Sequence, residues 1–266
     1  MKPQIQSASA FFGAIAFVVA AGTPFAPRAL ADELHVHDTL KECDIQFSAE
    51  LTQGSFERWT REVGDIIVYK NTGTEVLRAG RTELALSYMS TPIDQHSDAW
   101  NDTFHHPNSD HPLGDAIEFP AIYGRVGIGH RMDVGGYFTM NPEASYRFTG
   151  LGLKYDLSGD SGRWLDLAAS LDYGLLFGPD DTMIHAVGAN LHAGHGWRPV
   201  SVYAAGGMTW AHGEEMSPVV DLANTNTSAP QLSIGATPHV WGLFDIDVRA
   251  RFSAVNTYEI KLGYAF

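Results

Sequence analysis

A segment rich in histidine and aspartate, residues 94–112, contains the side chains best suited to metal binding. His105, His106, Asp110 and His111 fall within one short stretch of it. A set of imidazole and carboxylate groups suits zinc, copper or nickel. The spacing of these four residues matches no established ligand motif, so a plain solvated loop is the competing interpretation. The segment therefore predicts a divalent-metal site as one possibility and an ordinary loop as the other.

The overall composition excludes several other kinds of site. The chain has 266 residues, with 17 Lys and Arg against 31 Asp and Glu, so its formal net charge is −14. Such an acidic chain lacks the basic surface that nucleic-acid binding requires, and we expect no nucleic-acid partner. Cys43 is the only cysteine in the sequence. A disulfide framework and a zinc site built on paired thiolates are therefore excluded.

Residues 1–31 have the features of a cleaved secretory signal peptide. A lysine precedes an apolar stretch over residues 10–22, and an A-x-A site at residues 29–31 follows it. The apolar stretch is shorter than the roughly 20 residues that a membrane-spanning helix needs. We expect cleavage before Asp32. The lone cysteine lies too far beyond the apolar stretch for a lipoprotein signal, so we interpret it as a structural thiol.

The rest of the chain contains no run of 18 apolar residues, so any membrane-spanning part must consist of strands. The segment 258–266 alternates strictly between an apolar and a polar face. Its apolar face consists of Tyr258, Ile260, Leu262, Tyr264 and Phe266. Residues 245–252 alternate in the same way, with aspartates and arginines on the polar face. This pattern suits a barrel strand with lipid on one side and a lumen on the other.

Alternation of period two recurs in ten segments of the chain. They lie near residues 80–90, 117–129, 133–140, 145–157, 165–175, 183–194, 200–205, 231–240, 245–252 and 258–266. Both long connections, 91–116 and 213–229, fall on the same side of such a sheet, as barrel topology requires. We therefore predict an all-β fold over residues 76–266, a transmembrane antiparallel up-and-down β-barrel of about ten strands, with eight to twelve as the range.

The pattern resembles the outer-membrane β-barrel proteins of Gram-negative bacteria. In that family the last strand commonly ends in alternating aromatic residues with a terminal Phe, which corresponds here to Tyr258-x-Ile260-x-Leu262-x-Tyr264-x-Phe266. The resemblance covers about residues 76–266 and identifies no subfamily. It implies a place in the cell outer membrane, contact with outer-membrane lipid, and recognition of the terminal motif by the barrel-assembly machinery.

The alternation also predicts which charged side chains face the lumen. These are Arg81, Arg125, Lys154, Asp245, Asp247, Arg249, Arg251, Glu259 and Lys261, together with Glu83, Asp156, Asp166 and Asp172. Acidic and basic groups are nearly balanced, which favours cross-strand ion pairs because an unpaired charge in a narrow cavity is costly. The alternative is a narrow conduit in which these charges set the selectivity for solutes.

Residues 32–75 differ from the barrel segments because they are mixed and polar. An amphipathic stretch, residues 55–64, has apolar side chains at helical spacing, and Ser55 is a candidate helix cap. This helix would plug the lumen from the periplasmic side, or the whole segment would be a loosely attached periplasmic extension. A further alternative makes residues 65–71 an extra strand with a partner from residues 43–51, which gives twelve strands.

The last class to weigh is an enzyme built into the barrel. Some small outer-membrane barrels are lipid-modifying enzymes that carry a His-x-Ser motif on a strand, and this sequence contains none. His192 and His239 face the predicted lumen without an evident nucleophile. We therefore predict no enzyme and no cofactor, and a narrow porin-like channel or transporter for small solutes. The alternative is a non-conducting barrel that is structural or binds partners through its extracellular loops.

Overall fold

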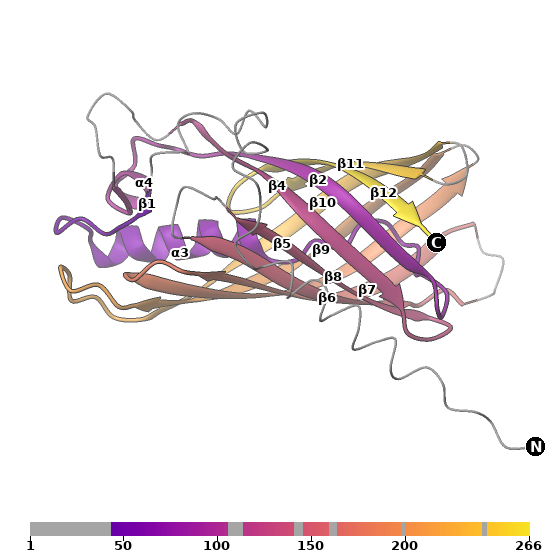
Figure 1. Cartoon of the computed structure of the whole chain (residues 1–266), viewed down its shortest axis with the longest axis horizontal. Helices are drawn as coiled ribbons and strands as arrows, with labels where there is room; N and C mark the ends of the chain where they lie inside the picture. The colour runs from indigo at the N-terminus through magenta and orange to yellow at the C-terminus, as the bar shows by residue number, and fades with distance from the viewer. Residues whose placement is uncertain (1–43, 106–113, 141–145, 160–163, 198–199, 241–243) are drawn as a thin grey trace, which may run out of the picture. The chain divides into compact units, whose positions relative to one another are not determined.

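The structure, a computed structural model, describes residues 44–105, 114–140, 146–159, 164–197, 200–240 and 244–266. Within these residues, ten antiparallel strands form one closed barrel (Figure 1). The strands are β2 (Thr82–Pro92), β4 (Ala116–Gly127), β5 (Met132–Met140), β6 (Arg147–Asp156), β7 (Asp166–Phe177), β8 (Thr182–Trp197), β9 (Val200–Glu215), β10 (Thr225–Val240), β11 (Phe244–Phe252) and β12 (Thr257–Ala265). Each barrel strand pairs with the next one along the chain, and β12 closes the barrel against β2. The predicted ten-stranded up-and-down barrel is confirmed.

Three strands are longer than the alternation predicted. β8, β9 and β10 have 16 residues each, so the connection between β9 and β10 covers residues 216–224 instead of 213–229. Gly206 and Gly207 interrupt the alternation in β9 and hide the continuation of the strand. A Cβ on Gly207 would lie 2.0 Å from the carbonyl oxygen of Ala189. Glycine is therefore needed where β8 and β9 approach closely.

The outward face of the barrel carries a band of exposed aliphatic side chains. Its members include Leu84, Leu86, Ile122, Leu151, Leu171, Leu191, Leu232, Ile260 and Leu262. Exposed aromatic residues accompany the band, among them Trp164, Trp197, Trp210 and Tyr258. Soluble proteins rarely expose a continuous apolar surface of this extent, whereas a barrel that crosses a membrane requires one.

The longest helix, α3 (Gln53–Ile67), covers the predicted amphipathic stretch and confirms a helix there. The Thr52 side chain caps it, because its oxygen accepts a hydrogen bond from the backbone N–H of Ser55 at 3.2 Å. The prediction that Ser55 is the cap is wrong, since Ser55 already lies in the first turn. No helix in the described ranges is long and apolar enough to cross a membrane.

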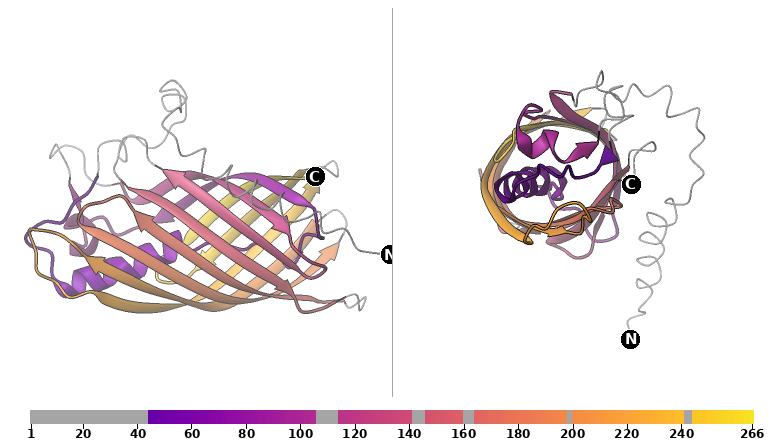
Figure 2. Two further views of the ribbon diagram at one scale, coloured as in Figure 1. Left: turned by 60° about the horizontal axis from the view of Figure 1, so that its bottom comes forward. Right: turned by 90° about the vertical axis from the view of Figure 1, so that its left-hand side faces the viewer.

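Helix α3 lies inside the barrel, as the view along the barrel axis shows (Figure 2). It contacts β6, β7, β8, β9 and β10. The packing is close: a Cβ on Gly64 would lie 2.3 Å from the Cβ of Ala211, and one on Gly174 would lie 2.2 Å from the carbonyl oxygen of Ile67. Both glycines therefore let the helix approach the wall at van der Waals distance.

The alternative with twelve strands is wrong. Residues 65–67 belong to α3, and the short strand β1 (Asp44–Ile45) pairs with β3 (Phe104–His105) instead of with the segment after the helix. Strand β3 and the short helix α4 (Asp98–Asn101) both belong to the connection between β2 and β4. Residues 44–52 are therefore held by this connection and add no strand to the barrel.

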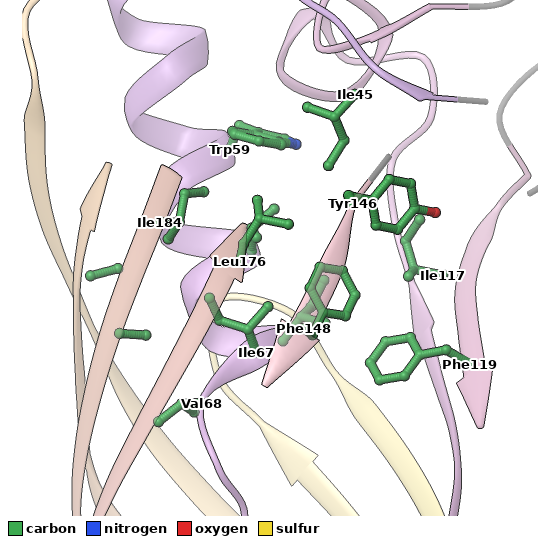
Figure 3. Packing of buried hydrophobic residues seen from close by; sticks show 14 of the residues in the cluster. Ile45, Trp59, Ile67, Val68, Ile117, Phe119, Tyr146, Phe148, Leu176 and Ile184 are labelled. Atoms are coloured by element: carbon green, nitrogen blue, oxygen red, sulfur yellow. The ribbon is translucent and has the colours of Figure 1, made fainter. Parts of the chain in front are cut away.

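A hydrophobic core fills the barrel around α3 (Figure 3). Trp59 and Ile67 from the helix are fully buried and meet inward-facing residues of the wall such as Leu176 and Ile184. Phe119 and Phe148, on β4 and β6, contact each other with ring centroids 5.2 Å apart. The lumen at this level is thus packed like the interior of a soluble domain.

Candidate functional site

The candidate site is the lumen on the far side of this core, where the chain continues from α3 towards β2. We call residues 44–77 the inner segment and residues 68–77 the strap. The strap has no helix or strand assignment, so its backbone groups depend on the barrel wall for hydrogen bonds. The wall residues that meet this need are mostly cations.

Five wall side chains donate to backbone carbonyl oxygens at the end of α3 and along the strap. The pairs are Arg251 with Asp65, Tyr137 with Ile67, Arg249 with Asn71, Lys154 with Thr72, and Arg125 with Glu75. The last three contacts measure 3.1, 2.8 and 3.2 Å. Charged donors make stronger hydrogen bonds than neutral ones. The strap is therefore bound to the wall mainly through its main chain.

Two of these cations have acidic partners on neighbouring strands. Arg125 forms ion pairs with Glu83 at 2.6 Å and with Asp133 at 3.4 Å. Arg249 on β11 pairs with Glu259 on β12, and these two side chains are almost completely buried. Pairing of this kind is what makes buried charge tolerable.

Two further contacts join the wall to the inner segment through side chains. Arg251 lies 3.0 Å from the Asp65 carboxylate of α3, and neither side chain is more than 3% exposed. Lys261 donates to the Thr72 hydroxyl at 2.8 Å and lies 3.5 Å from Glu83. The inner segment is thus part of the charge network of the lumen.

Asp172 on β7 collects three hydrogen-bond donors. They are Ser170 at 2.8 Å, Asn190 at 3.0 Å and, from the strap, Asn71 at 2.5 Å. The Ser170 oxygen also lies 3.0 Å from Nε2 of His192, so the register brings a hydroxyl to the histidine for which the sequence showed no nucleophile.

This group differs from a Ser-His-Asp triad. In a triad the carboxylate binds Nδ1 of the histidine and orients it towards the serine. Here Asp172 accepts from Ser170, and among the described residues Nδ1 of His192 has no hydrogen-bond partner. The geometry therefore fits a polar contact between wall and strap better than a catalytic base.

A small cavity of about 50 Å³ remains between the strap and the wall. Asp247 lines it and accepts hydrogen bonds from Tyr203 at 3.0 Å and from Thr237 at 2.9 Å. Its size and polar lining suit ordered water.

Most of the predicted lumen charges lie where the alternation placed them. Those buried in the wall are Lys154, Asp247, Arg249, Arg251 and Glu259, while Arg125, Asp245 and Lys261 are partly buried at its inner face. The placement of Arg81 is wrong: it precedes β2, is exposed, and its guanidinium lies at the barrel rim, 3.3 Å from the carbonyl oxygen of Ala265. Asp166 is also exposed, at the start of β7.

Asp133 was not among the predicted lumen charges, although it begins the predicted segment 133–140. Asp133 is the second residue of β5, is fully buried, and accepts from the backbone N–H of Leu77 at 2.9 Å. The signal was present, because Asp133 continues the inward-facing series of Gly135, Tyr137 and Thr139 on β5. The roles of Asp65 and Asn71 were not predicted, because the sequence carries no information on which wall residues the inner segment contacts.

The terminal motif and the histidine-rich loop have different outcomes. Tyr258, Ile260, Leu262 and Tyr264 alternate on the outer face of β12 and are 40–51% exposed, and Phe266 follows them, also exposed. Their recognition by the barrel-assembly machinery stays a prediction. Of the four metal candidates, His105 forms β3 with its backbone, while His106, Asp110 and His111 lie outside the described residues. The metal site also stays a prediction.

A closed barrel of antiparallel strands with an apolar outer band and a charged lumen is the architecture of a membrane-spanning barrel. The chain has the fold of the outer-membrane β-barrel proteins. No protein-family model and no curated protein matches its sequence. The barrel therefore has to be interpreted from its own geometry.

Solved structures with a similar fold include an outer-membrane channel from Pseudomonas putida, at 12% identity and a TM-score of 0.44 over 74% of this chain and 100% of that one. Ail, the attachment invasion locus protein of Yersinia pestis, is similar at 13% identity and a TM-score of 0.33, over 71% of this chain and 99% of that one. The outer-membrane protease OmpT of Escherichia coli is similar at 8% identity and a TM-score of 0.36, over 73% of this chain and 100% of that one. Likenesses this distant assign no activity to the present chain.

Proposed function

We propose that this protein is a gated conduit for small solutes in the outer membrane, closed in the described state by its inner segment. The observation that carries the proposal is the contact between wall cations and strap carbonyls, as in Arg249 with Asn71 and Lys154 with Thr72. A lumen that stayed filled permanently would be as stable or more stable with apolar packing, because buried ion pairs gain little over well-packed hydrophobic residues. Charged walls suit a lumen that water enters at times.

The width of the barrel supports a gated rather than an open conduit. A barrel of eight strands has an interior that side chains just fill, and ten strands make it only slightly wider. Helix α3 and the strap occupy this extra space. Passage of a solute therefore requires the inner segment to move.

The charges of the described wall give the open state little preference between cations and anions. Five buried or half-buried cations, Arg125, Lys154, Arg249, Arg251 and Lys261, face six acids, Glu83, Asp133, Asp172, Asp245, Asp247 and Glu259. With the inner segment displaced, Arg125 and Lys261 would keep Glu83 as a neighbour and Arg249 would keep Glu259, while Arg251 would lose Asp65. We therefore expect small polar solutes of either sign as the cargo.

A disulfide that locks α3 to the wall tests the proposal. A Cβ on Gly64 lies 3.7 Å from the Cβ of Ala186, within the range that a disulfide spans. The test protein carries Gly64→Cys and Ala186→Cys, with Ala211→Gly to relieve the 2.3 Å clash and Cys43→Ser to remove the native thiol. The matched control lacks only Ala186→Cys.

Conductance is measured in planar bilayers before and after reduction. We expect the oxidised protein to stay closed at every applied potential, and the reduced protein and the control to open intermittently. If oxidised and reduced protein conduct alike, the inner segment is not the gate. If none of the proteins ever conducts, the conduit is rejected.

The second candidate function is a non-conducting barrel that acts through its outer mouth. Contacts of residues 98–104 favour it: Trp100 of α4 donates to Glu62 of α3 at 2.6 Å, and Trp100 stacks on Phe104 with ring centroids 5.9 Å apart. These contacts tie this part of the β2–β4 connection to the inner segment. Absence of conductance from all variants above would leave this candidate in place.

A further inference from the structure

The inner segment is held at its start by three connections that share one end of the barrel. Residues 46 and 48 donate backbone hydrogen bonds to residues 103 and 102, in the β2–β4 connection. The backbone N–H of Phe47 donates to Asp181, in the β7–β8 connection, at 2.6 Å. Gln53 exchanges two hydrogen bonds with Ala223, in the β9–β10 connection.

The other end of the inner segment lies at the opposite rim. Residues 78–81 lead directly into β2, and Thr82 pairs with Phe266 through two backbone hydrogen bonds of 2.9 Å. The connections at this rim, such as the one between β4 and β5, are short. Figures 1 and 2 agree on the direction: the helix starts at the mouth with the long connections and the chain leaves near the C-terminus.

In outer-membrane barrels the short turns face the periplasm and the longer loops face outward. The rim near Thr82 is therefore the periplasmic one, and Asp44 lies at the extracellular mouth. This is the reverse of a plug that enters from the periplasm, as the sequence analysis suggested.

We infer that the inner segment runs through the lumen from the outside inward, with Asp44 at the extracellular mouth and Leu77 near the periplasmic rim. The hydrogen bonds of its start to three connections at one mouth, and the pairing of Thr82 with Phe266 at the other rim, fix this direction. Helix α3 and the strap lie between these two ends and pack against the wall.

The direction matters for any partner that moves the inner segment. At the periplasmic rim it continues through residues 78–81 into β2. At the extracellular mouth its start is held by hydrogen bonds to the three connections. A ligand or protein that releases these hydrogen bonds must therefore act from outside the cell. This inference concerns topology and holds whether or not the barrel conducts.

Labelling of single cysteines on intact cells tests the inference. The variant Cys43→Ser removes the native thiol, the only one of the chain, and Glu50→Cys adds one at an exposed position of the inner segment just before α3. A membrane-impermeant biotin maleimide then reports the side of the membrane on which this thiol lies. Two controls also carry Cys43→Ser. One adds Val219→Cys, at an exposed position in the β9–β10 connection, and the other adds His130→Cys, at an exposed position between β4 and β5.

We expect Glu50→Cys and the Val219→Cys control to be labelled on intact cells, and the His130→Cys control only after the outer membrane is permeabilised. The inference is overturned if Glu50→Cys is labelled only after permeabilisation while Val219→Cys is labelled without it. It is equally overturned if His130→Cys is labelled from outside, because the barrel would then have the opposite orientation.

Discussion

The two halves of the lumen are filled by the same segment in different ways. Around the start of α3 the filling is aromatic and apolar: Phe47 packs on Phe56 and Trp59 with ring centroids 5.6 and 5.7 Å apart. Around the strap it is polar, with contacts such as Arg249 to Asn71. The comparison shows that one inner segment combines a hydrophobic anchor at the outer mouth with a hydrogen-bonded clamp towards the periplasm.

The difference predicts how each half responds to change. Apolar packing depends on volume and is insensitive to charge, whereas a buried charge network is strongly affected when one partner is removed. Opening of the inner segment should therefore begin at the strap, where water can replace the wall donors. The anchor should hold α3 longest.

The largest effect is expected from Arg251→Met in the polar half. The substitution leaves the buried carboxylate of Asp65 without its cationic partner. This should lower the free energy of opening of α3 by about 3–5 kcal/mol. Native-state hydrogen exchange of the α3 amides measures this free energy. The double variant Arg251→Met/Asp65→Leu is the matched control and should recover most of the loss. If the double variant is as unstable as the single one, the ion pair is not the cause.

Leu51→Ala tests the apolar half. Leu51 is buried in the core cluster just before α3, and its truncation should lower the same free energy by about 2–5 kcal/mol through lost burial and a residual cavity. Salt should leave this loss unchanged. Leu262→Ala, on the lipid face, serves as the control and should leave the exchange of α3 unaltered. A salt-dependent loss for Leu51→Ala would contradict the division into two halves.

Gly64→Ala probes the contact between α3 and the wall. The added methyl group would lie 2.3 Å from the Cβ of Ala211, and overpacking of this kind costs about 1–3 kcal/mol. Thermal unfolding followed by circular dichroism and exchange of α3 should both report it. Ala211→Gly in the same chain should restore stability. A neutral single variant would mean that the helix does not sit against β9.

The smallest effect is expected from Thr52→Ala at the start of α3. Loss of the cap bond to Ser55 should cost about 1 kcal/mol. The matched variant Thr52→Asp keeps a side-chain acceptor and should behave like the natural protein in the same exchange measurement. Equal losses in both variants would argue against capping by residue 52.

The sequence predicted the strands of the barrel wall better than the contacts of the segment that fills the lumen. Strict alternation, as in residues 258–266, reports which face meets lipid, because burial on one side imposes period two. It failed where glycine carries no side chain to report, as at Gly206 and Gly207, and at Arg81, which lies one residue before strand pairing begins.

The contents of the lumen depend on contacts between distant residues. Amphipathic spacing predicted the helix but carried no information on which surface it faces or in which direction it runs. The contact of Ser170 with His192 depends on the register between β7 and β8. Such long-range pairings follow from barrel closure and cannot be derived from local pattern.

Hydrogen exchange of the natural protein in outer-membrane vesicles tests the central claim most directly. If residues 44–77 fill the lumen, the amides of α3 should exchange as slowly as those of the barrel strands, and the strap amides should exchange faster than α3 but much more slowly than an unstructured chain. Exchange of α3 at the rate of an unstructured peptide, with the strands still protected, would show that the lumen is not filled and would contradict the account.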